Sequence, residues 1–381
     1  LDSNHDDIIR LRRWLHQYPE VGFKEYKTSD FLKQELKSLG YEIIKNSVMG
    51  TGFYCDYVDL KSSRNSILAF RCDMDGLLIS ESNQFDYKSK NDGIMHACGH
   101  DVHMTIIFSL AKFLITNNIK SNYVIRFIFQ PAEEIAPGGA VKMIQGGAIK
   151  RVHTIIGMHV FPKFAPSKIA IRHGYMTANI DEILITLQGP GGHTSRPENT
   201  ADLIYLSSKL ILDLTTKIQE FAYKNSNVVL SFGSIQAGKN SNVIPNHLIL
   251  KGTLRYLDKD SKVLLHQMIK KIIKEMEKEN EISITFKIPY SSPGIINDKD
   301  TTQLIINSSK ECLGPENVIL MDKSSMGGED FAYYLQKVKG AYIRLGCFNG
   351  EVDEIHKPNF DVDEECIFTG IKTLFSIINQ Y

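Results

Sequence analysis

The chain has 381 residues, of which 43% are hydrophobic and 23% are charged, so it is long enough for one large folded domain that carries a smaller one. Its 44 basic residues balance its 44 acidic ones, which argues against nucleic acid or an anionic membrane as the main partner. Because it has no long apolar run, no signal-peptide pattern and only scattered cysteines, we expect a cytoplasmic protein without membrane contact.

Helical periodicity and short apolar runs alternate in the first half of the chain. In chain order, we expect helices 5–17 and 25–39, strand 66–71, helix 101–116, and strands 123–129 and 153–158. The second helix stops at Gly40, a residue type that favours helix ends. Such alternation predicts an α/β domain with a mixed, largely parallel sheet and helices on both faces.

The pattern changes between residues 176 and 289. Here we expect strand 180–187, helix 200–222, strands 227–235 and 247–256, helix 260–278 and strand 282–288. Two helices on one face of a four-stranded sheet would form a small α+β unit. The first pattern then resumes with helix 300–313, strand 341–346 and helix 364–379. We therefore predict that unit 176–289 is inserted into a larger domain made of 1–175 and 290–381.

Candidate metal ligands directly follow three of the predicted strands. Asp75 lies after the first strand, Glu133 and Glu134 lie after the second, and His159 lies after the third. Open α/β sheets bind ligands beyond the carboxyl ends of their strands, so these side chains should converge.

A further candidate pair, Cys98 and His100, lies at a predicted helix start. One glycine separates the two residues, so both could reach neighbouring metal positions from one tight turn. Of the adjacent Glu133 and Glu134, one could bind a metal while the other faces the attacking water, as metal-assisted hydrolysis requires. Each residue alone has a commoner structural explanation, such as a buried Cys, a solvated Glu pair or a structural His. Their conjunction at three strand ends predicts a metal site.

Nine stretches of the sequence together resemble a known family. They are Leu11–Gln17, Arg71–Asp75, Met95–Asp101, Phe129–Glu134, Gly157–Val160, Gly191–His193, Asn242–Pro245, Met326–Phe331 and His356–Phe360. In this order they resemble the amidohydrolase branch of the aminoacylase and carboxypeptidase metallohydrolase superfamily. That branch includes hippurate hydrolases, N-acetyldiaminopimelate deacetylases and plant hydrolases of indole-acetyl amino acids. The resemblance extends from about residue 11 to residue 368 and implies a zinc-exopeptidase-like fold.

The resemblance implies a site for two divalent metal ions. Cys98 matches the bridging ligand, and His100, Glu134, His159 and His356 match the remaining ligands. Zn or Mn is the expected metal, with Co or Ni as alternatives, because nitrogen, oxygen and sulfur ligands accept several divalent ions.

The resemblance also implies roles for residues around the metals. Glu133 matches the general base, and Asp75 matches a carboxylate that orients an active-site ligand. His193 matches a residue that stabilises the oxyanion, often across a dimer interface, and Asn242 matches a residue that holds substrate. The inserted unit would then be a lid and dimerisation domain, which implies a homodimer.

The expected activity is metal-dependent hydrolysis of the amide bond of an N-acyl amino acid of the N-acetyl or N-benzoyl type. A dipeptidase or aminopeptidase on the same scaffold is the nearest alternative. A catalytically inactive metal-binding or ligand-binding protein is the other alternative, although such a protein would have no need of a base at Glu133.

Overall fold

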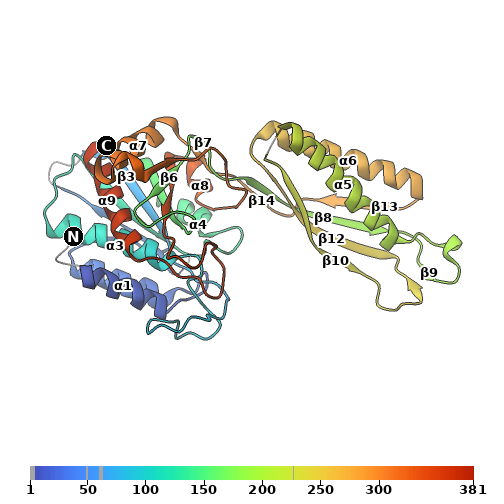
Figure 1. Cartoon of the computed structure of the whole chain (residues 1–381), viewed down its shortest axis with the longest axis horizontal. Helices are drawn as coiled ribbons and strands as arrows, with labels where there is room; N and C mark the ends of the chain where they lie inside the picture. Colours follow the sequence, from blue (N-terminus) through green and yellow to red (C-terminus); the bar gives the residue numbers. More distant parts are fainter. Residues whose placement is uncertain (1–4, 49, 60–62, 226) are drawn as a thin grey trace. The chain divides into compact units, whose positions relative to one another are not determined.

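The computed structural model describes residues 5–48, 50–59, 63–225 and 227–381, which fall into two compact units (Figure 1). The first unit comprises the chain up to Met176, Ile295–Lys323 and Glu329–Tyr381, and the second comprises Thr177–Gly294 and Ser324–Gly328. Residues 290–294, which we had placed in the larger domain, belong to the second unit because β14 (Ser291–Ser292) pairs with that unit's strand β8. Among the described residues, no helix is both long and apolar enough to cross a membrane.

The first unit is built on an eight-stranded sheet with the order β1-β2-β4-β3-β5-β17-β6-β16. Its strands are β1 (Ile43–Val48), β2 (Gly52–Tyr57), β3 (Ser63–Asp73), β4 (Tyr123–Gln130), β5 (Val152–Phe161), β6 (Ile169–Ile171), β16 (Val318–Leu320) and β17 (Lys339–Gly346). The central strands β4, β3, β5 and β17 run parallel, as do β6 and β16, whereas the other neighbours pair antiparallel. The expected mixed, largely parallel sheet is therefore confirmed.

Helices cover both faces of this sheet because its central strands are apolar on both sides. Leu68 and Phe70 of β3 join the core formed with α1 (His5–Gln17), α2 (Tyr26–Ser38), α3 (His100–Thr116), α7 (Lys299–Leu313) and α9 (Glu365–Gln380). Ala69 points the other way, into a second core with α4 (Gly139–Gln145) and α8 (Ala332–Leu335). The alternation follows from the two-residue period of a strand.

The second unit is an antiparallel sheet packed against two long helices. Its strands are β8 (Asn179–Gln188), β10 (Val229–Ala237), β12 (His247–Tyr256), β13 (Ser283–Lys287) and β14, in the order β10-β12-β8-β13, with β14 also on β8. Figure 1 shows α5 (Leu203–Asn225) and α6 (Lys259–Asn280) side by side, and both share one core with the sheet. The sheet has five strands rather than the expected four, because the two-residue β14 continues along β8 beyond β13.

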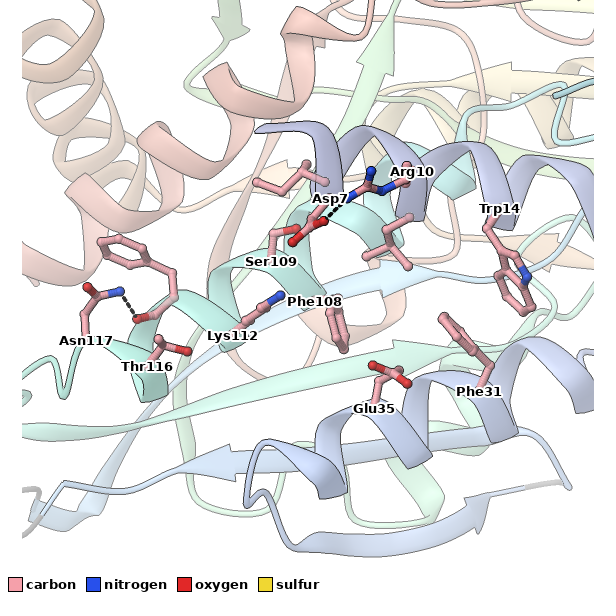
Figure 2. Close-up of a pocket in the computed structure, with 13 residues that line it drawn as sticks. Asp7, Arg10, Trp14, Phe31, Glu35, Phe108, Ser109, Lys112, Thr116 and Asn117 are labelled. Atoms are coloured by element: carbon pink, nitrogen blue, oxygen red, sulfur yellow. Dashed lines mark hydrogen bonds and ion pairs between the residues drawn. The ribbon is translucent and has the colours of Figure 1, made fainter. Parts of the chain in front are cut away.

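A cavity of about 310 Å³ lies where α1, α2 and α3 pack together (Figure 2). Aromatic side chains such as Trp14, Phe31 and Phe108 line it. None of its lining residues is a candidate ligand, so this cavity is separate from the site described next.

Candidate metal centre

The candidate ligands gather at the carboxyl ends of the parallel strands of the first unit. Asp73 ends β3 and pairs with Gln130, which ends the neighbouring β4. We expected His159 just beyond its strand, but β5 runs on to Phe161 and carries His159 two residues before its end. The convergence nevertheless agrees with the rule that open α/β sheets place their sites at this edge.

Cys98 lies at the centre of the cluster. Its Sγ is 3.2 Å from Nε2 of His159 and 3.2 Å from Nε2 of His356. The same His356 Nε2 is 3.2 Å from Oε1 of Glu134. Ligand atoms that share one tetrahedral zinc at about 2.0–2.3 Å lie roughly 3.3–3.8 Å from one another. Donors from four distant stretches are thus close enough to coordinate common cations.

His100 and Glu134 provide the other side of the cluster. The His100 Nε2 and Glu134 Oε1 atoms are 4.0 Å apart, and the buried Nε2 atom has no hydrogen-bond partner among the described residues. Burial lowers the pKa of His100, but Asp73, Asp75 and Glu134 outweigh it and raise that pKa to about 10. This environment favours a positive charge at the ring, and a divalent cation could supply that charge in place of a proton. The Nε2 atom of His100 and the acidic groups around it therefore fit a metal ion.

Backbone carbonyls orient the two buried imidazoles. Nδ1 of His100 bonds to the backbone oxygen of Asp75 at 2.8 Å, and Nδ1 of His159 bonds to that of Val160 at 2.7 Å. Each bond places the proton on Nδ1 and leaves Nε2 as an acceptor toward the cluster. Burial, with His103 adding to the effect, holds the pKa of His159 well below its ordinary value, so this ring is neutral. A neutral imidazole is the form that binds metal.

Asp75 holds the Glu133–Glu134 turn in place through the backbone. Its Oδ1 accepts the backbone N–H of Glu133 and its Oδ2 accepts that of Glu134, both at 3.0 Å. Asp75 thus links the turn to His100, which bonds to its backbone oxygen.

Glu133 is half-buried, in an acidic environment. Burial, with Glu329, Glu134 and Asp330 adding to the effect, raises the pKa of Glu133 well above its ordinary value. Arg71 opposes the shift, but it is already engaged by Asp330 at 2.7 Å and Glu329 at 3.2 Å. A carboxylate with a raised proton affinity next to a metal site suits a general base.

The turn that carries Cys98 and His100 requires glycine between them. Gly99 has φ 80° and directly precedes α3, and a Cβ there would lie 2.4 Å from Cγ2 of Val160. A side chain would therefore meet both backbone strain and a steric clash. This close approach holds the helix start against the end of β5.

His103 lies beside the cluster but is not available as a ligand. Its Nδ1 is 2.6 Å from Oδ1 of Asp73, and its Nε2 accepts the backbone N–H of Val160 at 2.9 Å. Because both ring nitrogens are engaged, His103 acts as a brace between two strand ends. Asp73, His100 and His103 lie close enough together to hold a metal ion, but His103 has a structural role in this group.

His193 and Asn242 belong to the second unit, where they are neighbours. Strands β9 (Gly192–His193) and β11 (Val243–Ile244) pair His193 with Val243, and the backbone N–H of Thr194 donates to the Asn242 carbonyl at 3.2 Å. Nδ1 of the exposed His193 accepts the backbone N–H of Ser195 at 3.1 Å. That bond leaves the proton on Nε2, so this atom is a hydrogen-bond donor.

The buried network that supports the site was not predicted from the sequence. Arg71 donates to Gln130 at 2.8 Å, to Asp73 at 2.5 Å and to Asp330 at 2.7 Å, which ties together the ends of β3 and β4 and the segment before α8. Arg71 and Asp330 both lie in stretches that resemble the known family, yet nothing in their local pattern indicates that they meet. A buried arginine so close to three acceptors is a structural clamp.

Comparison with known proteins adds a family relationship to this geometry. Residues 69–380 match the family described as Peptidase family M20/M25/M40. An N-acetyldiaminopimelate deacetylase of Bacillus pumilus is 33% identical over 376 residues, which cover 97% of each chain. An N-acetyl-L-cysteine deacetylase of Bacillus subtilis is 32% identical over 98% of this chain and 88% of its own.

A solved structure shows the same architecture. The Bacillus subtilis YXEP protein, described as a dinuclear metal-binding peptidase of the M20 family, superposes with a TM-score of 0.84. It is 29% identical in sequence, and the match covers 99% of this chain and 98% of that one.

Proposed function

Because the chain belongs to peptidase family M20/M25/M40, we propose that this hydrolase cleaves the amide bond of N-acyl amino acids with two bound divalent cations. The observation that carries this proposal is that Cys98 lies 3.2 Å from both His159 and His356, beside a buried His100 Nε2 atom that has no hydrogen-bond partner among the described residues. Relatives that are deacetylases of N-acetyl amino acids support this class of substrate.

We assign the metal ligands as in the resemblance. The two ions would be held by Cys98, His100, Glu134, His159 and His356. The mixture of thiolate, imidazole and carboxylate favours Zn or Mn and also accepts Co or Ni. When bound, the cations would supply the positive charge that acidifies a water molecule and polarises the acyl carbonyl.

The residues around that centre have separate roles in the reaction. Glu133 accepts a proton from the attacking water and returns it to the departing amine, and its raised pKa makes it a stronger base. Asp75 fixes the backbone from which Glu133 and Glu134 project. Nε2–H of His193 would donate to the developing oxyanion, and Asn242 would hold the substrate.

We also propose that the second unit serves as lid and dimerisation domain of a homodimer. Its strand β10 is an edge of the sheet, and α5 exposes the large apolar side chains of Tyr205, Leu212 and Tyr223. An edge strand beside exposed apolar groups is typical of a surface that a second copy covers.

The test couples metal analysis with a substrate panel. Protein freed of metal with a chelator and reloaded with Zn²⁺ or Mn²⁺ should bind two equivalents and hydrolyse N-acetyl and N-benzoyl amino acids faster than free dipeptides. Preference for free dipeptides would replace this proposal with a dipeptidase, and metal binding without any hydrolysis would replace it with an inactive binding protein.

A further inference from the structure

Glu25 is a buried carboxylate that the proposed mechanism does not use. It lies just before α2 with an exposed fraction of 0%. Its Oε1 accepts the backbone N–H of Phe23 at 3.0 Å and that of Ala132 at 2.8 Å, and its Oε2 accepts the hydroxyl of Thr51 at 2.7 Å. Burying a carboxylate is costly unless hydrogen bonds compensate it, so these three bonds are what keeps Glu25 in this position.

The Ala132 contact reaches the turn that carries Glu133 and Glu134. The three consecutive N–H groups of residues 132–134 are all accepted by carboxylates, the first by Glu25 and the next two by Asp75. Two carboxylates from distant parts of the chain therefore fix the whole backbone of this turn. Asp75 binds the backbone of Glu133 and Glu134, and Glu25 binds the backbone of Ala132, where the turn begins.

The entry of the turn needs such a partner because its backbone is in an unfavourable conformation. Ala132 has φ 50° and Phe23 has φ 61°, both in the left-handed region that residues other than glycine rarely adopt. The one Oε1 atom of Glu25 binds the N–H groups of both residues. Conformations of this kind persist only where the surroundings impose them.

The loop bearing Glu25 also packs directly on the turn. A Cβ at Gly22 would lie 2.6 Å from Cδ1 of Ile135 and 3.0 Å from Cβ of Ala132. The two segments thus touch without room for a side chain between them, which independently places this loop as the support of the turn.

We propose that Glu25 is a positioning residue: by holding the Ala132 backbone, it sets the turn from which Glu133 meets the attacking water and Glu134 meets a metal ion. This inference rests on the proposed function for the role of Glu133, but the effect on Glu134 is measurable by metal binding alone. Burial raises the pKa of Glu25 to about 7, with the Thr51 bond opposing the shift and the charge of Asp75 adding to it.

The test compares Glu25→Ala and Glu25→Gln with a matched control, Thr51→Val. The alanine variant loses the acceptor for Ala132. The glutamine variant keeps an amide oxygen for Ala132 and turns its NH₂ toward the Thr51 hydroxyl, which can accept. Thr51→Val removes one hydrogen bond of the same carboxylate but leaves the Ala132 bond intact. Glu25→Asp keeps the charge but falls one methylene short, and it replaces the alanine variant if that one does not fold.

Two quantities are measured on the full chain: the dissociation constant for Zn²⁺ by chelator competition, and kcat and KM at saturating Zn²⁺. Glu25→Ala should weaken Zn²⁺ binding and lower kcat by about 10- to 100-fold each, with little change in KM, as for other residues that orient ligands. Glu25→Gln and Thr51→Val should stay within a few-fold of the wild type in both quantities.

Equal losses in Glu25→Ala and Thr51→Val would show that the carboxylate only stabilises the fold and would overturn the proposal. Wild-type affinity and kcat in folded Glu25→Ala would overturn it as well. If the wild type hydrolyses no N-acyl amino acid, the proposed function fails, while the Zn²⁺ affinities of the variants still decide the role of Glu25.

Discussion

At the scale of single residues, Glu133 differs from its neighbours because its carboxylate has no hydrogen bond or ion pair with another residue that the structure describes. Glu134 faces His356 at 3.2 Å, and Asp330 is bonded to Arg71 at 2.7 Å. Glu133 instead has its pKa raised by burial and by the acidic groups around it. A carboxylate in this state is poised to take a proton from water, which the ligands and the clamped acids cannot do.

We therefore expect Glu133→Gln to lower kcat by about 10²- to 10⁴-fold, because the amide cannot accept the proton. Metal content should remain at the wild-type level, since this variant keeps every proposed ligand. Elemental analysis and steady-state kinetics on the same sample measure both. Glu354→Gln, which changes an exposed glutamate paired with Lys357, is the control and should leave kcat unchanged. Turnover near the wild-type rate in Glu133→Gln would refute its assignment as the base.

Some of these residues could be predicted from the sequence and others could not, for a physical reason. Glu133, Glu134 and His159 lie at or near the ends of apolar strands, and the topology of a parallel sheet predicts that such ends meet. His356 has no such signal: it lies in a loop with φ 64°, 258 residues from Cys98, and only the family resemblance pointed to it. Glu25 contacts a backbone group 107 residues away, and no local pattern encodes that contact.

At the scale of elements, the position of the cluster depends on how α3 begins. Gly99 and Gly93 both have positive φ, 80° and 75°, but only Gly99 is crowded by Val160. We expect Gly99→Ala to destabilise the fold by about 2–4 kcal/mol, through both backbone strain and steric clash, and to displace Cys98 and His100. A Cβ at Gly93 would meet no atom within 4 Å, so Gly93→Ala should destabilise the fold only through backbone strain, by about 1 kcal/mol.

Urea denaturation and Zn²⁺ affinity of the two glycine variants test this expectation. A large loss of affinity confined to Gly99→Ala would show that the close approach of the helix start to β5 builds the site. Equal effects in the two variants would mean that backbone conformation alone, and not the contact with Val160, accounts for the need for glycine.

Long elements were predictable from sequence and short ones were not. The helix expected at 5–17 matches α1, and the strand expected at 247–256 matches β12, because both carry a full period of apolar residues. The two-residue strands β7 (Gly174–Tyr175), β9, β11, β14 and β15 (Ile296–Asn297) have no period to detect, since their partners alone define them. The six-residue strands β1 and β2 were missed too, and their register with each other is irregular.

At the scale of the whole molecule, the chain holds separate apolar cores. The core of the second unit lies entirely within residues 183–286, and the cores of the first unit include none of those residues. Each unit thus has the internal packing expected of an independently stable domain. The candidate ligands lie in the first unit, whereas His193 and Asn242 lie in the second. Metal binding and turnover should therefore be separable.

Excision of residues 177–294 provides that separation. Strands β7 and β15 pair antiparallel, with Tyr175 opposite Ile296, and the backbone N–H of Met176 donates to the Ile295 oxygen at 2.8 Å. A two-residue Asn-Gly link between Met176 and Ile295 would therefore close a short hairpin without moving either strand. We expect the shortened chain to fold and bind two equivalents of metal, but to lose at least about 100-fold in kcat/KM, as when an oxyanion donor is removed.

The full-length His193→Ala variant is the matched control for that excision. If the second unit contributes a donor to the reaction, this variant should lose a comparable factor in kcat while light scattering reports the same mass as for the wild type. The shortened chain should instead scatter as a monomer, because the edge of β10 and the apolar face of α5 are gone. Wild-type hydrolysis by the shortened chain would show that the second unit has no part in the mechanism. Dimers of the shortened chain would show that the second unit has no part in assembly.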